Sequence, residues 1–412
     1  MFKIVRFPSS LESFFEPFRE SFLWQQFDYF RWLVLLTGFA WGRRNIANLC
    51  RHLDPRKMAH RSRFNNFMLV GRWEPEKLLR QKADEILAML DPHEGDVIEM
   101  ILDDSKKQKR GKHMDAVGWI HDPVTGRKIR GHQYVKATLR FRGHSIPLGI
   151  RLYVKRDDCP DLDVEFRKTT QLAADLIASF DPPEGVKVRV LFDIYYLCPT
   201  VVKACRRKRF RFVSALKSNR NLFKGGRKLK AGTYGKNLFA RRRKTKMILC
   251  KGDRASRYAY VDAGWMNVSA LGRLHVVFSR KSGGKRILGL VSDDSRLSAR
   301  GMVTAYDGRW SIEVFFKDSK QLLGLGQYQN RSYGAAVTHL HLVCFAYALL
   351  THIAITREGE KGKRKADAAD RSTATLQNEL RRIVWDDLAE HLKALPSGDA
   401  VIQELDQLLI AA

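Results

Sequence analysis

Acidic residues are scarce in this chain of 412 residues. It contains 44 aspartates and glutamates against 74 lysines and arginines, which gives a formal net charge of +30 and a pI of about 10.1. So large a positive excess favours a polyanionic partner, either a nucleic acid or an anionic membrane surface. A small acidic ligand would not require it. The length favours about two to four domains with ample chain for a buried core.

Cysteine is also sparse, and its spacing excludes two classes of fold. Six cysteines occur, of which Cys198 and Cys205 are the closest pair. This pattern fits neither a disulfide framework nor a zinc module, and it favours a reducing compartment. The first residues lack the continuous apolar core of a signal peptide. We therefore expect a soluble, cytoplasmic protein.

Long apolar runs are few, and only two segments need consideration as membrane spans. Residues 33–40 are too short to cross a bilayer, and residues 339–355 contain three histidines within a marginal length. We predict that both segments form buried helices. Glycines interrupt the basic residues, and no long amphipathic helix lies beneath them, which disfavours a membrane-surface protein. No membrane partner is expected.

The apolar pattern predicts helices first and then a sheet. Residues 1–95 are expected to be helical, including a helix that begins at Pro75 with acidic residues beside it. Beyond residue 96, short apolar runs alternate with helical patterns. Strands are predicted at 97–102, 134–141, 145–154, 186–192 and 210–216, and helices at 165–180 and 199–208. This order predicts a mixed α/β sheet flanked by helices.

A concentrated basic segment follows the predicted sheet. Residues 203–257 contain 21 lysines and arginines and one acidic residue. Glycines punctuate the segment, and short strands are predicted near 247–250, 258–261 and 274–278, so we interpret it as basic and β-rich. Phosphate contacts from such residues would supply DNA affinity. The candidates are Lys217, Arg220, Arg241, Arg242 and Arg243. For each residue taken singly, a solvated position without function is an equal alternative.

The remaining residues return to helical patterns. Helices are expected to resume at about residue 305 and to continue through the apolar segment. Residues 358–370 have the composition of a charged linker, and an amphipathic helix is expected at 374–395.

Two aspartates directly follow buried strands. Asp103 follows residues 97–102, and Asp193 follows residues 186–192. An unpaired carboxylate near a buried sheet is costly, and a bound divalent cation offsets that cost. Oxygen-only ligands select Mg²⁺ or Mn²⁺. The alternative for each aspartate is an ordinary strand-end turn or helix N-cap.

A third polar group occurs close to residue 310. Tyr306 is followed at intervals of three, four and seven residues by Arg309, Glu313 and Lys320, and the last three would share one face of a helix. The alternative is an amphipathic helix with a single Arg–Glu ion pair. That alternative does not account for the tyrosine.

This spacing, Tyr306-x₂-Arg309-x₃-Glu313-x₆-Lys320, resembles the Y-R-E-K signature of the DDE transposases encoded by bacterial insertion sequences. Stretches around both aspartates, at 212–220 and at 63–73, are also similar to segments of that group. They occur in the same order over roughly residues 40–355. The resemblance implies a ribonuclease-H-like mixed sheet flanked by helices, with an all-α N-terminal domain and a β-rich insertion at about 222–290.

The resemblance also implies roles for individual residues. The three catalytic acids and metal ligands would be Asp103, Asp193 and Glu313, with Mg²⁺ as cofactor and Mn²⁺ as a substitute. Three residues would hold DNA phosphates beside them, namely Tyr306, Arg309 and Lys320. For the first acid, the family's usual spacing before a hydroxyl residue selects Asp103. An alignment that places the acid directly before Ser105 selects Asp104 instead.

The implied activity is cut-and-paste DNA transposition, in which two metal ions support cleavage of transposon ends and strand transfer. Its partners would be the DNA of terminal inverted repeats and of the target, and a second copy of the chain in a homodimer on DNA. The location would be the bacterial cytoplasm, at the nucleoid. Residues 1–95 would serve DNA binding or dimerisation, 96–356 catalysis, and 357–412 would form the linker and last helix. The alternatives are a metal-dependent nuclease or resolvase of the same fold and an inactive DNA-binding relative.

Overall fold

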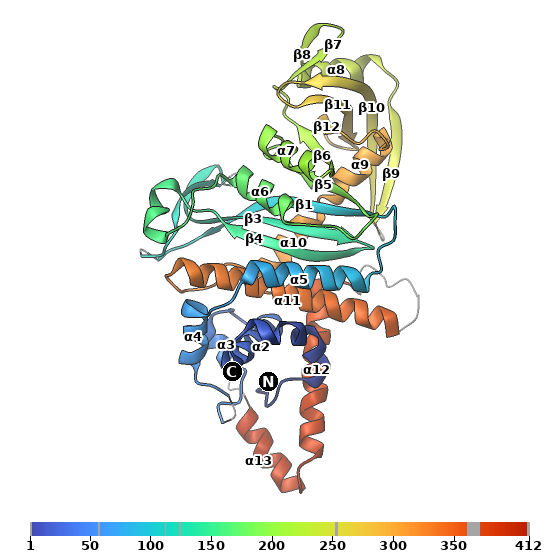
Figure 1. The fold of residues 1–412 in the computed structure, drawn as a ribbon. Coiled ribbons are helices and arrows are strands. Elements are labelled where there is room, and N and C mark those ends of the chain that lie inside the picture. The colour runs from blue at the N-terminus through green and yellow to red at the C-terminus, as the bar shows by residue number, and fades with distance from the viewer. Residues whose placement is uncertain are drawn as a thin grey trace.

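The computed structural model describes residues 2–56, 58–111, 113–122, 125–251, 254–360 and 371–409. This part of the chain is elongated, with three layers stacked along its long axis (Figure 1). A β-rich insertion lies at one end, a sheet with helices on both faces lies in the middle, and a helical layer lies at the other end. Both termini lie in the helical layer, where Phe2 and Leu409 form a β-bridge.

The central sheet is mixed, as the sequence predicts. Its strands run in the order β4-β3-β1-β5-β6, with β1, β5 and β6 parallel and β3 and β4 antiparallel to their neighbours. The strands are β1 (Val97–Gln108), β3 (Arg127–Phe141), β4 (His144–Leu152), β5 (Lys187–Phe192) and β6 (Arg211–Leu216). The short strand β2 (Gly118–Asp122), which the sequence did not predict, pairs with β3. This arrangement confirms the ribonuclease-H-like fold class.

Two details of the sheet compare directly with the prediction. The predicted strands at 134–141 and 145–154 are confirmed as a hairpin, and the turn residues Arg142 and Gly143 have the positive φ values of 45° and 83° that suit a tight connection. In contrast, β1 does not end at Asp103 as predicted. It continues to Gln108 because Asp103 to Gln108 pair with β3, which supplies hydrogen-bond partners for their backbone N–H and C=O groups.

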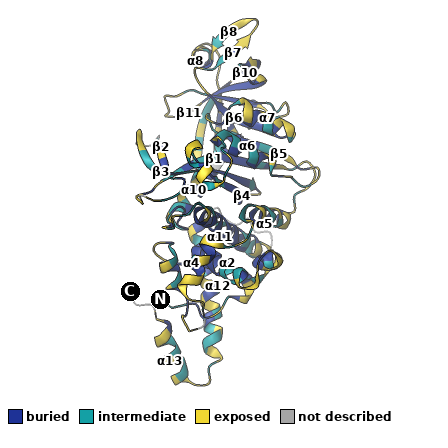
Figure 2. Ribbon diagram, turned by 60° about the vertical axis from the view of Figure 1, so that its left-hand side comes forward, coloured by how far each residue is buried: buried dark blue, intermediate teal, exposed yellow. Residues whose placement is uncertain are grey.

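Helices cover both faces of the central sheet (Figure 1). On one face lie α6 (Thr169–Ala178) and α7 (Pro199–Arg207), and on the other lie α5 (Pro75–Met89), α10 (Ser311–Gln321) and α11 (Tyr333–Glu360). Helix α11 contacts β4, α5, α2, α4 and α12, so it joins the sheet to the helical layer. It is long and apolar enough to cross a membrane, but 89% of its most apolar window is buried inside the protein. The predicted buried helix at 339–355 is therefore confirmed, and Figure 2 shows its central position.

The helical layer is built from both ends of the chain. Its main N-terminal members are α2 (Trp24–Phe39), α3 (Ile46–Cys50) and α4 (Arg61–Val70), which follow the short α1 (Glu12–Phe15). Its C-terminal members are α12 (Thr373–Lys393), close to the predicted bounds, and α13 (Gly398–Leu408), which was not predicted. Residues 361–370 of the predicted linker lie outside the described residues.

The insertion extends the central sheet. Strand β12 (Leu288–Ser292) pairs with β6, and β11 (Gly272–Lys281), β10 (Arg254–Val268), β7 (Asn221–Lys224) and β8 (Arg227–Lys230) follow in that order. Strand β9 (Thr245–Lys251) also pairs with β10. The strands predicted within 247–278 are confirmed. The insertion also contains a helix that was not predicted, α8 (Ala231–Arg241).

Gly131 on β3 provides a test of how closely β1 and β3 must approach. A Cβ atom at this position would lie 2.2 Å from the carbonyl oxygen of Lys107 and 2.9 Å from Cα of Gln108. We expect Gly131→Ala to lower the free energy of unfolding by about 1–3 kcal/mol, because neither contact belongs to a flexible side chain. Urea unfolding would measure this. Gly398→Ala is the control, since its Cβ meets no atom within 4 Å, and equal stability of both variants would contradict the expectation.

Candidate active site

Asp103 and Asp193 occupy neighbouring positions on adjacent parallel strands. The register between β1 and β5 runs from Val97 opposite Lys187 to Leu102 opposite Phe192, so the next residue on each chain is one of the two aspartates. The Asp193 carboxylate accepts hydrogen bonds from the backbone N–H groups of Tyr195 at 2.8 Å and Tyr196 at 3.2 Å. These bonds hold its side chain at the end of β5.

Arg309 connects the first aspartate with the third predicted acid. Its Nη1 donates to Oδ2 of Asp103 at 3.0 Å, and its Nη2 donates to Oε1 of Glu313. Glu313 lies in the first turn of α10, whereas Arg309 lies at the bend between α9 (Ala299–Gly308) and α10. The guanidinium therefore bridges two carboxylates that are far apart in the sequence.

The bend corrects the prediction of one continuous helical face from Arg309 to Lys320. Helix α9 ends at Gly308, whose carbonyl oxygen accepts a hydrogen bond from Nη1 of Arg140 at 3.2 Å. A Cβ atom at Gly308 would meet the same guanidinium at 2.0 Å, so any larger residue there would displace the end of the Arg140 side chain. The chain turns there, and α10 begins at Ser311.

The environment of Asp103 favours its protonated form. Burial is the largest cause that raises the pKa of Asp103, the Arg309 guanidinium opposes it, and the charges of Asp193 and Asp104 add to the increase, so that the pKa is about 7. The side chain is 17% exposed. In this setting the carboxylate needs a further cation, besides Arg309, in order to ionise fully at neutral pH.

Asp104 faces the opposite side of the sheet, because successive side chains of a strand alternate between faces. Its Oδ2 accepts a hydrogen bond from Nε2 of Gln133 at 2.8 Å, and its Oδ1 accepts one from the Tyr196 hydroxyl at 3.4 Å. Sequence reasoning did not identify either partner. Of the two alternatives for the first acid, Asp103 is the one that shares a partner with Glu313.

Tyr306 and Lys320 also lie near this part of β1. The Tyr306 ring centroid is 5.8 Å from the guanidinium carbon of Arg309. Burial raises the pKa of Tyr306, Arg309 lowers it, and Asp193 and Asp103 raise it further. The Nζ atom of Lys320, in the last turn of α10, donates to Oγ of Ser105 at 2.6 Å. The bend thus keeps all four signature residues together although it breaks their common helical face.

The predicted basic residues differ in their surroundings. Lys217, Arg241, Arg242 and Arg243 are exposed, and the last three lie at the end of α8. Arg220 instead donates to the carbonyl oxygens of Leu197 at 2.8 Å and Ser269 at 3.1 Å, so it ties the insertion to the loop before α7.

A basic cavity in the insertion was missed at the sequence level. It has a volume of about 550 Å³, and its cationic lining residues are Lys230, Lys236, Lys285 and Arg286. The adjacent Lys285 and Arg286, which follow two glycines, are the sequence feature that could have indicated this cavity.

The three acids suit a divalent metal in their donor chemistry, since carboxylate oxygens are the ligands that hard cations prefer. Among the described residues, no group of three or more His, Cys, Asp or Glu side chains is arranged to hold a metal ion. Arg309 lies between Asp103 and Glu313, and the two carboxylates share its single positive charge. Ligation by all three acids therefore requires the guanidinium to move away.

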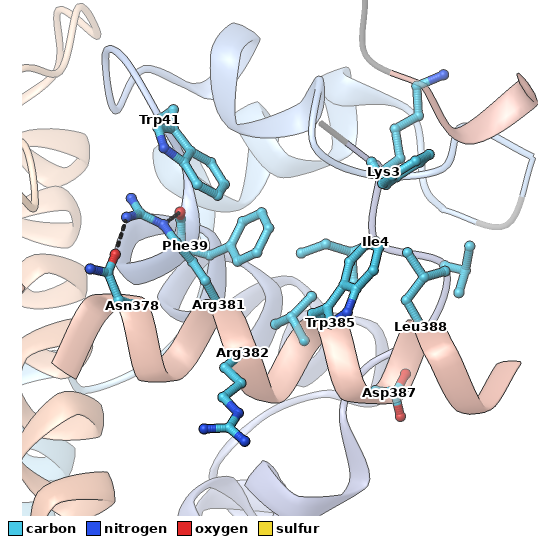
Figure 3. Close-up of a pocket in the computed structure, with 13 residues that line it drawn as sticks. Lys3, Ile4, Phe39, Trp41, Asn378, Arg381, Arg382, Trp385, Asp387 and Leu388 are labelled. Atoms are coloured by element: carbon cyan, nitrogen blue, oxygen red, sulfur yellow. Dashed lines mark hydrogen bonds between the residues drawn. The ribbon is translucent and has the colours of Figure 1, made fainter. Parts of the chain in front are cut away.

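A second, apolar pocket lies in the helical layer, between the first residues of the chain and α12 (Figure 3). Its volume is about 390 Å³, and Trp41 and Trp385 are among its lining residues. Asp387 is the one carboxylate in that lining. The pocket therefore offers no acidic cluster for phosphodiester chemistry.

The pKa of Asp103 gives a prediction for the protein in EDTA. Because the folded-state pKa of about 7 lies above the unfolded value near 3.9, the contribution of Asp103 to stability is full below about pH 4 and is lost as pH rises through 7. Relative to Asp103→Asn, the wild type should lose roughly 1–4 kcal/mol between pH 4.5 and 8. Urea unfolding across this range would measure the difference, and parallel pH profiles for the two proteins would contradict it.

Comparison with known protein families agrees with this geometry. Residues 26–266, more than half of the chain, match the family model described as DDE superfamily endonuclease. The matched range includes Asp103 and Asp193, while Glu313 lies beyond it. A comparison with curated proteins gives no match. The chain therefore belongs to the DDE superfamily endonucleases, which use divalent metal ions and act on DNA.

Proposed function

We propose that this protein is a DNA transposase that cleaves transposon ends and joins them to target DNA. The observation that supports this most is that Arg309 pairs with Asp103 and Glu313, while Lys320 contacts Ser105, two residues further along β1. Arginine binds phosphate as a planar fork, and lysine binds it as a point charge. Such a pair can hold a cleaved DNA end in place, which strand transfer requires.

In this proposal the acids Asp103, Asp193 and Glu313 hold Mg²⁺, for which Mn²⁺ can substitute. When bound, two such ions activate the attacking oxygen and stabilise the leaving oxygen of an in-line displacement at phosphorus. Arg309 pairs with Asp103 and Glu313 before DNA binds and then turns to a DNA phosphate. Tyr306 positions that phosphate near Asp193. Lys320, already directed at Ser105, contacts a neighbouring phosphate.

The insertion is proposed to carry much of the remaining DNA contact. Its exposed cations include Arg241, Arg242 and Arg243, together with Lys217 beside it. We assign Arg220 a structural role, because its guanidinium is engaged with two carbonyl oxygens.

The three-part division of the chain also stays a proposal. Residues 1–95 would serve DNA binding or dimerisation, 96–356 catalysis, and 357–412 would form the linker and last helices. The partners would be terminal inverted repeats, target DNA and a second copy of the chain at the bacterial nucleoid.

A metal-dependent nuclease or resolvase is the second candidate, because it needs the same acids. The two differ in joining, since only a transposase transfers a 3′-hydroxyl to target DNA. The test uses purified protein, Mg²⁺, and a pre-nicked duplex carrying the inverted repeat that flanks the coding sequence.

Joining should depend on Arg309 and Lys320. Charge-assisted contacts contribute about 1.5–3 kcal/mol each, and misplacement by about 1 Å can cost on the order of a hundredfold in rate. We expect Arg309→Ala and Lys320→Ala to slow joining about tenfold to a hundredfold with little loss of duplex binding. Asp193→Asn and Glu313→Gln should abolish both cleavage and joining. The matched control is Asp104→Asn, whose carboxylate faces away from Arg309. Cleavage without joining by the wild type would favour the nuclease.

Affinity for DNA should depend on the end of α8. Changing Arg241, Arg242 and Arg243 together to glutamine should weaken binding to all duplex sequences alike. The slope of log affinity against log salt should become shallower by about 0.9 for each phosphate that these arginines no longer neutralise. A control variant removes the same charge elsewhere, at the exposed residues Lys77, Arg382 and Lys393. If both triple variants show the same slope, α8 does not contact the duplex.

A further inference from the structure

A polar cavity lies where the loop after α10 meets α3 and α4. Its volume is about 350 Å³, which is at the low end for ligand pockets and suits a phosphate group with part of its nucleotide. Its polar lining residues include Arg44, His60, Arg61, Ser62, Asn65 and Asn330. No aspartate or glutamate belongs to the lining. The cavity is therefore rich in donors and cations and has no anion of its own.

Arg44 is the buried cation of this cavity. Its side chain is engaged with the carbonyl oxygens of Thr37, Gly42 and Leu322, and the residue is 6% exposed. These bonds satisfy three of the five guanidinium N–H donors but bring no negative charge. Burial and, as a smaller cause, the positive charge of Arg381, which Figure 3 shows beside Trp41, together lower the pKa of Arg44 to about 10. A buried cation without a carboxylate is costly, and an anion in the adjoining space would offset that cost.

Further donors line the same space. Arg61 and Ser62 begin α4, a helix of ten residues, so the positive end of its dipole lies at the cavity. The Nδ2 atom of Asn330 is buried and has no hydrogen-bond partner in the described part of the chain. Asn330 itself is a half-buried residue of the lining, and a phosphate oxygen beside its side chain would supply the acceptor that Nδ2 lacks.

The cavity is connected with the active site through the loop at 322–330. This loop leaves α10 just beyond Lys320, and its Gln327 accepts a hydrogen bond at Oε1 from the backbone N–H of Arg44 at 2.9 Å. Gly326 of the loop packs against Lys107 of β1, where a Cβ atom would lie 2.7 Å from the lysine Cγ. The cavity is therefore held in a fixed position relative to the acids.

We propose that this cavity is a subsite for a backbone phosphate of the bound DNA. The inference rests on the proposed function, which supplies the DNA, and it adds a second anchoring point in the helical layer. Arg61 contacts the phosphate directly, and Asn330 donates to one of the phosphate oxygens. The buried Arg44 adds a positive charge beside the cavity. The bound phosphate would fix the DNA strand at a set distance from Glu313.

Two variants with a matched control test the subsite. Arg61→Gln removes a charge from the cavity, and Asn330→Leu removes only a neutral donor. The control is Arg63→Gln, which makes the same charge change at an exposed position of α4 outside the cavity. Affinity for a random 30-base-pair duplex is measured over a range of NaCl concentrations, after thermal unfolding has shown that each variant is folded.

Arg61→Gln should weaken binding and flatten the salt dependence by about 0.9, the value for one neutralised phosphate. Asn330→Leu should weaken binding several-fold with an unchanged slope. Arg63→Gln should match the wild type. Equal slopes for Arg61→Gln and Arg63→Gln would overturn the subsite.

Inorganic phosphate distinguishes a DNA phosphate from a free anion. If phosphate alone raises the melting temperature of the wild type but not of Arg61→Gln, while both bind DNA equally, the cavity holds a free anion and the DNA subsite is wrong. A wild type that binds DNA but neither cleaves nor joins would refute the transposase and leave the binding comparison valid. Equal binding by the variants alongside normal joining would refute only the subsite.

Discussion

The parallel pairing of β1 with β5 is the constraint on which the candidate site depends. Its register ends with Leu102 opposite Phe192, so two aspartates reach the same edge of a buried sheet. Two negative charges that are partly buried and close together are unfavourable unless a cation lies beside them. In this structure Arg309 supplies that charge. The fold therefore places two carboxylates where a nearby positive charge stabilises them. An arginine, a metal ion or both can supply that charge.

Further cations around Asp103 follow from the same sheet. Lys136 stands opposite Asp103 in the β1–β3 ladder and is fully buried against the ring of Phe315. Burial lowers its pKa to about 7, so its charge is held only weakly at neutral pH. Lys320 reaches Ser105 two residues further along β1. Asp103 thus lies near several cations, and of these Arg309 is the one that bridges it to Glu313.

The sequence predicted the strands of this site better than the contacts between them. Residues 97–102 and 186–192 were recognisable as strands because apolar runs are a local signal, and the fold class followed from their order. The pairing of Asp103 to Gln108 with β3 was not predictable, because those residues are polar and their partners are more than twenty positions away. The bend at Gly308 depends on Arg140, a contact across the fold. Arg220 lies in a segment rich in lysine and arginine, which is typical of DNA-binding proteins. Only the structure shows that its guanidinium donates to two carbonyl oxygens.

The two ends of α10 explain how Arg309 can be released without loss of the helix. At the N-terminal end, Arg309 holds α10 to β1 through Asp103 and Glu313. At the C-terminal end, Arg44 donates to the carbonyl oxygen of Leu322, and Gln327 accepts from the Arg44 backbone. The second connection does not involve Asp103 or Glu313, so it is independent of the ion pairs of Arg309. In the proposed function, Glu313 would therefore exchange its arginine for a metal ion while α10 stays attached to the helical layer.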